Sequence, residues 1–176
     1  MPVHRLNHAV LYVRDARTSA AFYGDVLGFR VTVELPGGAG AFLRAPSSTN
    51  DHDLALFSVG AAAGDSAAGR STVGLYHLAW EVETLDDLEE HAAALAAAGA
   101  LVGASDHGTT KSLYARDPDG IEFEVVWVIP AHLLTEQDVE AGGGRPLPLR
   151  LDEEKVRFGA QTRGGLGISV PLGVGL

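Results

Sequence analysis

The feature that most constrains the fold of this chain is an internal repeat at an offset of about 69 residues. The stretch "LNHAVLYV" aligns with "LYHLAWEV", which places His8 on His77. Further along, "FLRAP" aligns with "YARDP" and "LALFSV" with "IEFEVV", so that Phe57 falls on Glu124. Each half shows the pattern of a strand, a helix and three further strands. The duplication therefore predicts an α+β fold built from two tandem βαβββ modules.

Local signals predict where the elements of each module begin and end. In the first half, Asp15 is a candidate N-cap and Gly28 a candidate end for one helix. In the second half, Thr84 is the N-cap, with Asp87 at the third helical position and Gly99 at the C-terminal end. Alternating or branched apolar runs predict the strands, which we expect at residues 5–13, 30–35, 41–45, 53–59, 74–83, 100–105, 110–116 and 121–128.

Composition shifts divide the chain into four parts. Residues 1–60 form the first module, and the small, Gly-rich residues 61–72 form a linker without periodicity. Residues 73–129 form the second module. Residues 130–176 are punctuated by Pro and Gly, and we expect them to be an extension that wraps the body or makes a subunit contact.

Charge and composition exclude several classes of function. A net charge of −10 over 176 residues argues against nucleic acid or an anionic membrane as partner. The chain has no cysteine, so a disulfide framework and a thiolate metal site are both excluded, and any metal must bind His, Asp or Glu. No stretch has the roughly 20 apolar residues of a membrane span, and the N-terminus lacks the apolar core of a signal peptide. We therefore expect a cytoplasmic protein.

The repeat also predicts a metal site. His8 and His77 occupy equivalent positions and can meet across a pseudo-twofold axis, where a carboxylate of the last strand can join them. Strand alternation places Glu122 and Glu124 on one face and does not choose between them. Two imidazoles and one carboxylate on one side of a metal are typical of non-haem Fe(II) oxygenases, whose remaining positions hold substrate and O₂.

The stretch "DPDGIEFEV" resembles the closing motif of the vicinal oxygen chelate superfamily, which groups glyoxalases, bleomycin-resistance proteins and extradiol dioxygenases. The resemblance covers roughly residues 5–128 and implies that Glu124 is a metal ligand together with His8 and His77. It also implies that the two modules form one eight-stranded, cupped, mixed sheet around the metal, and that the protein is a homodimer.

A finer resemblance concerns "DHGTTKSLYARDPDGIEFE", which is similar to the signature of small extradiol catechol dioxygenases. It implies catalytic roles for His107 and Tyr114, and Ser105 is a mild departure from the pattern. The stretch "NDHDLALF" resembles the extradiol segment whose histidine is an acid/base residue, which here is His52. These motifs imply an oxidoreductase, a catechol 2,3-type dioxygenase that uses Fe(II), with Mn(II) as a possible substitute, to insert O₂ into an aromatic diol.

The chemistry of these residue types agrees with that reaction. A catechol that binds Fe(II) through both oxygens must lose at least one proton, which a base such as His52 can accept. Tyr114 can donate a hydrogen bond to a substrate oxygen, and His107 can contact another. Phe57, aligned with Glu124, leaves three protein ligands, whereas a glutamate there would favour a glyoxalase-type site with four.

Two alternatives remain open on the same scaffold. A glyoxalase-like lyase or isomerase would work with Ni, Co or Zn and would not need O₂. A small-molecule (drug) binding protein would bind its ligand without metal, and alanine at His8 or His77 would leave that affinity unchanged.

Overall fold

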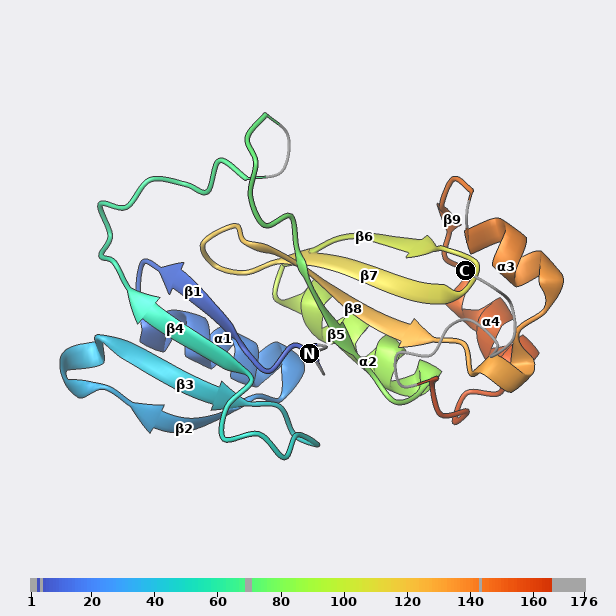
Figure 1. Cartoon of the computed structure of the whole chain (residues 1–176), viewed down its shortest axis with the longest axis horizontal. Coiled ribbons are helices and arrows are strands. Elements are labelled where there is room, and N and C mark those ends of the chain that lie inside the picture. The colour runs from blue at the N-terminus through green and yellow to red at the C-terminus, as the bar shows by residue number, and fades with distance from the viewer. Residues whose placement is uncertain (1–2, 4, 69–70, 143, 166–176) are drawn as a thin grey trace. The chain divides into compact units, whose positions relative to one another are not determined.

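The structure is a computed structural model that describes residues 3, 5–68, 71–142 and 144–165 (Figure 1). The chain divides into two compact units. The first unit comprises Met1–Thr72 together with the turn Asp117–Ile121, and the second comprises Val73–Arg116 and Glu122–Leu176. Each unit contains one βαβββ module, which confirms the α+β fold class and the duplication.

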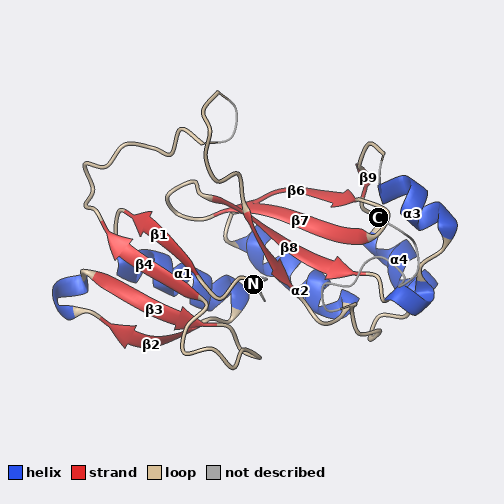
Figure 2. Ribbon diagram, in the orientation of Figure 1, coloured by secondary structure: helices blue, strands red, loops and turns tan. Residues whose placement is uncertain are grey.

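The first unit contains a four-stranded sheet and one long helix (Figure 2). The spatial order of the strands is β1-β4-β3-β2, with β1 and β4 parallel and the other pairs antiparallel. A short 3₁₀ turn at Pro36–Gly38 joins β2 to β3. The elements are β1 (Ala9–Val13), α1 (Ala16–Leu27), β2 (Arg30–Glu34), β3 (Gly40–Arg44) and β4 (Leu54–Ser58).

Helix α1 begins and ends at the two predicted caps. The Asp15 side chain accepts a hydrogen bond of 2.8 Å from the Thr18 backbone N–H, and Gly28 closes the helix in the left-handed region at φ 70°. The helix packs on β3 and β4, and the sheet face beneath it buries Leu11, Leu43, Leu54 and Leu56. Strand alternation leaves the side chains between these leucines on the opposite face.

The second unit repeats this module and adds a fifth strand. The strand order is β5-β8-β7-β6-β9, with β5 and β8 parallel and the other pairs antiparallel. Helix α2 begins with the predicted capping box, because the side chains of Thr84 and Asp87 each bond the other's backbone N–H. The module elements are β5 (Leu78–Glu81), α2 (Leu85–Ala97), β6 (Leu101–Asp106), β7 (Thr110–Arg116) and β8 (Glu122–Val128).

The described part of the segment after β8 packs on the second module. It contains η2 (Ala131–Leu133), α3 (Glu136–Gly142), β9 (Leu147–Pro148) and α4 (Leu151–Phe158). Strand β9 pairs with the edge strand β6, and α4 packs on α2. The ring of Phe158 lies 5.4 Å from the buried ring of Trp127, whose Nε1–H donates to the Thr162 carbonyl at 3.1 Å.

The strand register corrects one detail of the repeat. Phe42 and Tyr114 are equivalent in the two modules, and their partners on the neighbouring strand are Ala55 and Glu124. Pairing of β1 with β4 and of β5 with β8 gives the same match. Ala55 is therefore the counterpart of Glu124, and the alignment of Phe57 with Glu124 was wrong by two residues. A shift of two residues preserves the alternation of faces, so the apolar pattern cannot detect it.

Candidate metal and substrate site

His77 and Glu124 form the centre of the candidate site in the second unit. His77 directly precedes β5, and Glu124 lies on the parallel neighbour β8. His77 Nε2 and Glu124 Oε2 are 3.2 Å apart, and both side chains are largely buried. Glu124 alternates with Phe123 and Val125, which are buried in the core. Glu124 therefore lies on the sheet face opposite to that core.

The separation within this pair would allow both side chains to bind one metal ion. Two donor atoms that each lie about 2.1 Å from an ion, at right angles to one another, are roughly 3 Å apart. The observed separation of 3.2 Å fits that arrangement. The other ring nitrogen, Nδ1, is buried without a hydrogen-bond partner among the described residues. Imidazole with carboxylate is a donor set that suits Fe(II), Mn(II) and similar ions.

The second glutamate of the strand has a different partner. Glu122 lies on the same face as Glu124, and its Oε2 is 3.3 Å from Arg116 Nη2 on β7. The Arg116 guanidinium therefore forms an ion pair with the Glu122 carboxylate and offsets its negative charge. Strand alternation alone could not show which of the two glutamates is the candidate metal ligand. The structure places Glu124, and not Glu122, beside His77.

Tyr114 and His107 extend this face of the second unit. Tyr114 lies opposite Glu124 in the β7–β8 ladder, and its ring centroid is 5.8 Å from that of His77. The Tyr114 hydroxyl oxygen lies 2.7 Å from His107 Nε2. Burial, with the nearby charge of Glu124, raises the pKa of Tyr114 to about 12. Its phenol therefore keeps its proton at neutral pH.

His8 and His52 lie together in the first unit. Their ring centroids are 4.5 Å apart. His52 also contacts Phe42 edge to face at 5.1 Å, and Phe42 contacts Phe57 at 5.9 Å. His8 Nδ1 is 2.8 Å from Asn7 Oδ1, and His52 Nδ1 is 3.0 Å from Asp51. The face of the first sheet that α1 does not cover thus carries two imidazoles within an aromatic cluster.

The structure groups the six predicted site residues by unit. His77, Glu124, Tyr114 and His107 come together in the second unit, and His8 and His52 come together in the first. Across the part of the chain that the structure describes, no three His, Asp or Glu side chains are close enough to hold one ion. The participation of His8 as a third ligand stays a prediction.

Two residues escaped the sequence analysis, Tyr76 at the site and Lys111 on the opposite face of β7. The Tyr76 ring lies 4.7 Å from the His77 ring. Lys111 is only 1% exposed, and its ammonium group pairs with Asp106 of β6 and Glu154 of α4. A signal for Lys111 was present, because it shares strand parity with Leu113 and Ala115, whose side chains face the core.

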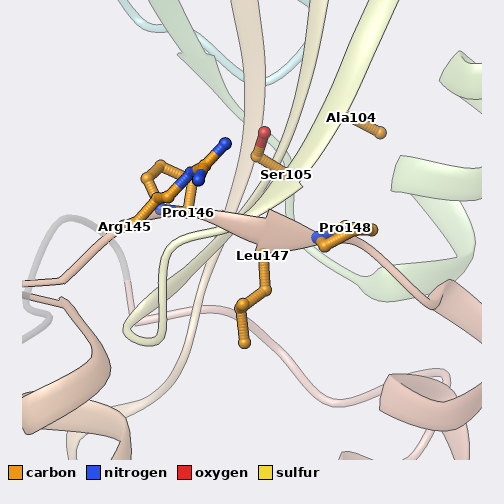
Figure 3. Close-up of a pocket in the computed structure, with 6 residues that line it drawn as sticks. All are labelled: Ala104, Ser105, Arg145, Pro146, Leu147 and Pro148. Carbon is orange, nitrogen blue, oxygen red and sulfur yellow. The ribbon is translucent and has the colours of Figure 1, made fainter.

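A separate pocket of about 460 Å³ lies where β6 meets β9 (Figure 3). Its charged group is the guanidinium of Arg145, and the hydroxyl of Ser105 is nearby. None of the six predicted site residues contributes to it. Its lining residues are Ala104, Ser105, Arg145, Pro146, Leu147 and Pro148.

Comparison with known proteins decides the family. Residues 5–125 match the model of the Glyoxalase/Bleomycin resistance protein/Dioxygenase superfamily. The chain belongs to this superfamily. Members share the scaffold and differ in chemistry, so membership establishes the fold and leaves the reaction to the residues of the site. Within the described residues, the structure has no helix long and apolar enough to cross a membrane.

Two curated relatives carry names of dioxygenases. The chain is 38% identical over 122 residues to biphenyl-2,3-diol 1,2-dioxygenase 3 of Rhodococcus globerulus, a match of 69% of this chain and 62% of the relative. It is 29% identical over 120 residues to metapyrocatechase 2 of Cupriavidus necator, a match of 66% of this chain and 34% of the relative. The matches thus span less than two thirds of either relative.

A solved structure supports the fold. The crystal structure of a glyoxylase/bleomycin resistance protein/dioxygenase domain from Frankia sp. EAN1pec matches with a TM-score of 0.63 at 25% identity. The match covers 76% of this chain and 98% of that domain.

Proposed function

We propose that this protein is an Fe(II)-dependent extradiol dioxygenase that cleaves the ring of a catechol-type substrate. The observation that carries the proposal is the arrangement on one sheet face of the second unit. There, the pair His77 and Glu124, which could bind a metal, lies beside the hydrogen-bonded pair Tyr114 and His107. The names of the two curated relatives, a diol dioxygenase and a metapyrocatechase, support the same reaction class.

In this proposal, His77, Glu124 and His8 hold the metal. Bound Fe(II) supplies the redox chemistry toward O₂ that protein side chains lack, and Mn(II) is the alternative ion. Three protein ligands of this kind would leave the ion able to bind a diol and O₂. Ala55, the counterpart of Glu124 in the first module, has no donor atom in its side chain, and the module therefore offers no fourth ligand at that position.

The chain's own residues handle the protons. His52 accepts a proton from the catechol as the diol binds. Tyr114 stays protonated, with its pKa raised to about 12, and therefore donates a hydrogen bond to a substrate oxygen. His107 orients the Tyr114 hydroxyl through their contact of 2.7 Å. The rings of Phe42 and Phe57 offer an apolar surface that suits an aromatic ring. Assembly as a homodimer in the cytoplasm belongs to the same proposal.

The test is anaerobic loading of the purified chain with Fe(II), followed by a panel of catechols in air. We expect oxygen uptake together with a visible absorbance band from the ring-opened product. The variant His77→Gln should lose both, whereas His132→Gln, at an exposed histidine of η2, should retain them. Oxygen-independent turnover with Ni, Co or Zn would instead indicate a lyase or isomerase. An iron-loaded chain that consumes no oxygen with any catechol would refute the proposal.

A further inference from the structure

The turn that carries His107 has a defined conformation. His107 N–H donates to the Thr110 carbonyl at 2.9 Å, which closes the turn between β6 and β7. The Gly108 N–H donates to Asp106 Oδ1 at 2.8 Å. Because the His107 ring contacts Tyr114 from this turn, any displacement of the turn changes the distance between the two side chains.

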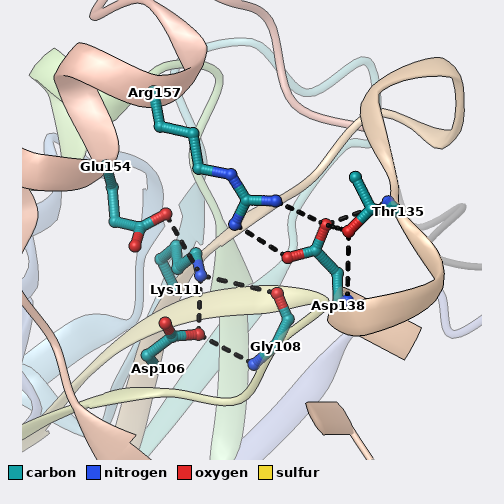
Figure 4. Close-up of polar contacts among 7 residues, drawn as sticks. All are labelled: Asp106, Gly108, Lys111, Thr135, Asp138, Glu154 and Arg157. Carbon is teal, nitrogen blue, oxygen red and sulfur yellow. Dashed lines mark hydrogen bonds and ion pairs between the residues drawn. The ribbon is translucent and has the colours of Figure 1, made fainter. Parts of the chain in front are cut away.

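Helix α3 packs directly against this turn at Gly108. Gly108 has a φ of +77°, and a methyl group there would lie 2.6 Å from the Gly142 nitrogen and would overlap the Asp138 carbonyl. Only a glycine permits this approach of two backbones. Helix α3 is itself held to α4, because Arg157 donates to both oxygens of Asp138, at 2.8 and 2.7 Å (Figure 4).

Helix α4 reaches the same turn through Lys111. The Lys111 Nζ lies 2.6 Å from Asp106 Oδ1 and 3.2 Å from Glu154 Oε2, and it also approaches the Gly108 carbonyl at 3.4 Å (Figure 4). Lys111 is 1% exposed. A buried ammonium is tolerated only where carboxylates pair with it, so this network fixes the distance between α4 and the turn.

We propose that α3 and α4 form a positioning element for His107. Helix α3 contacts the turn through Gly108, and α4 contacts it through Glu154 and Lys111. Strand β9 adds a third attachment, since Leu147 pairs with Asp106 at the end of β6. The role of His107 in the reaction rests on the proposed function, but its placement by these helices does not. Glu154, Lys111 and Gly108 are positioning residues, because they act through the turn.

The first test observes the His107 ring in the full chain by ¹H–¹⁵N NMR, with the signal assigned from the variant His107→Gln. Glu154→Gln removes the charge that faces Lys111, and we expect it to shift or broaden the His107 ring signals. The matched control is Glu153→Gln on the same helix, where Glu153 is exposed and pairs with Arg150 at 3.1 Å. Lys155→Met is a second control, because Lys155 pairs with Asp86 and Glu89 of α2 and not with the turn residues. Unchanged His107 signals in folded Glu154→Gln would overturn the proposal.

The second test is a double-mutant cycle on turnover by the iron-loaded chain. We expect Glu154→Gln to lower kcat/KM about tenfold, since small displacements of a catalytic group are costly. In a His107→Ala background the same change should cost less than about twofold, because its effect passes through His107. An equal loss in both backgrounds would contradict a positioning role. If the wild type consumes no oxygen, the proposed function fails, and the NMR comparison alone decides the placement of His107.

Discussion

Tyr114 shows how the surroundings of one residue change its pKa. The β7–β8 ladder places it opposite Glu124, and both burial and that carboxylate disfavour the phenolate, which raises the pKa of Tyr114 from 10.0 to about 12. The folded state therefore holds the Tyr114 proton more tightly than the unfolded chain does. The resulting stabilisation is complete below pH 10 and is lost as the pH rises toward 12.

We predict that Tyr114→Phe lowers ring-cleavage turnover by a factor on the order of 10 to 100, because the substrate loses a hydrogen-bond donor. The absorbance of phenolate near 295 nm tests the same residue without activity. The difference between alkaline titrations of the wild type and of the variant should show one step near pH 12. A step at the ordinary tyrosine value of about 10 would show that Glu124 and burial do not act on this side chain.

Strand β7 shows how one element serves two purposes. Alternation directs Tyr114 toward the site face and Lys111 toward α4, on opposite sides of the same strand. The helix caps at Asp15, Gly28 and Thr84 were predictable from sequence, because each depends on residues a few positions away. The contact of Lys111 with Glu154 was not predictable, because the two residues are distant in sequence and no periodic pattern connects them. The two-residue β9 is likewise too short to leave a pattern.

We predict that Lys111→Met destabilises the protein by about 3 kcal/mol, because it leaves Asp106 and Glu154 facing each other without a cation. Adding Glu154→Gln should relieve part of this repulsion, so that the double variant is more stable than the sum of the single effects implies. Urea denaturation of the four proteins of this cycle measures the coupling. Additive losses, within about 0.5 kcal/mol, would mean that the three side chains do not act as a network.

At the scale of the whole molecule, the duplication was the strongest predictor. The two modules were predicted from it, and His8 and His77 became candidate metal ligands because they occupy equivalent positions. It could not fix which residue of β4 matches Glu124, since Ala55 and Phe57 lie on the same face. It also gave no information on residues 130–165, which have no counterpart in the first half and whose role is visible only in their contacts with the second module.

These contacts make the C-terminal segment part of the second unit's core, and we predict that a chain ending at Pro130 is markedly less stable. Trp127 would lose Phe158 and the Thr162 carbonyl, and Lys111 would lose Glu154. Exposing one large aromatic side chain costs about 2–3 kcal/mol, before the cost of a charge with fewer partners is added.

In a Trp80→Phe background, the fluorescence of Trp127 should shift to longer wavelength and the melting temperature should fall. A chain ending at Gly165 retains these contacts and is the matched control. If the chain ending at Pro130 melts at the same temperature as that control, with unshifted emission, the segment does not contribute to the stability of the second module.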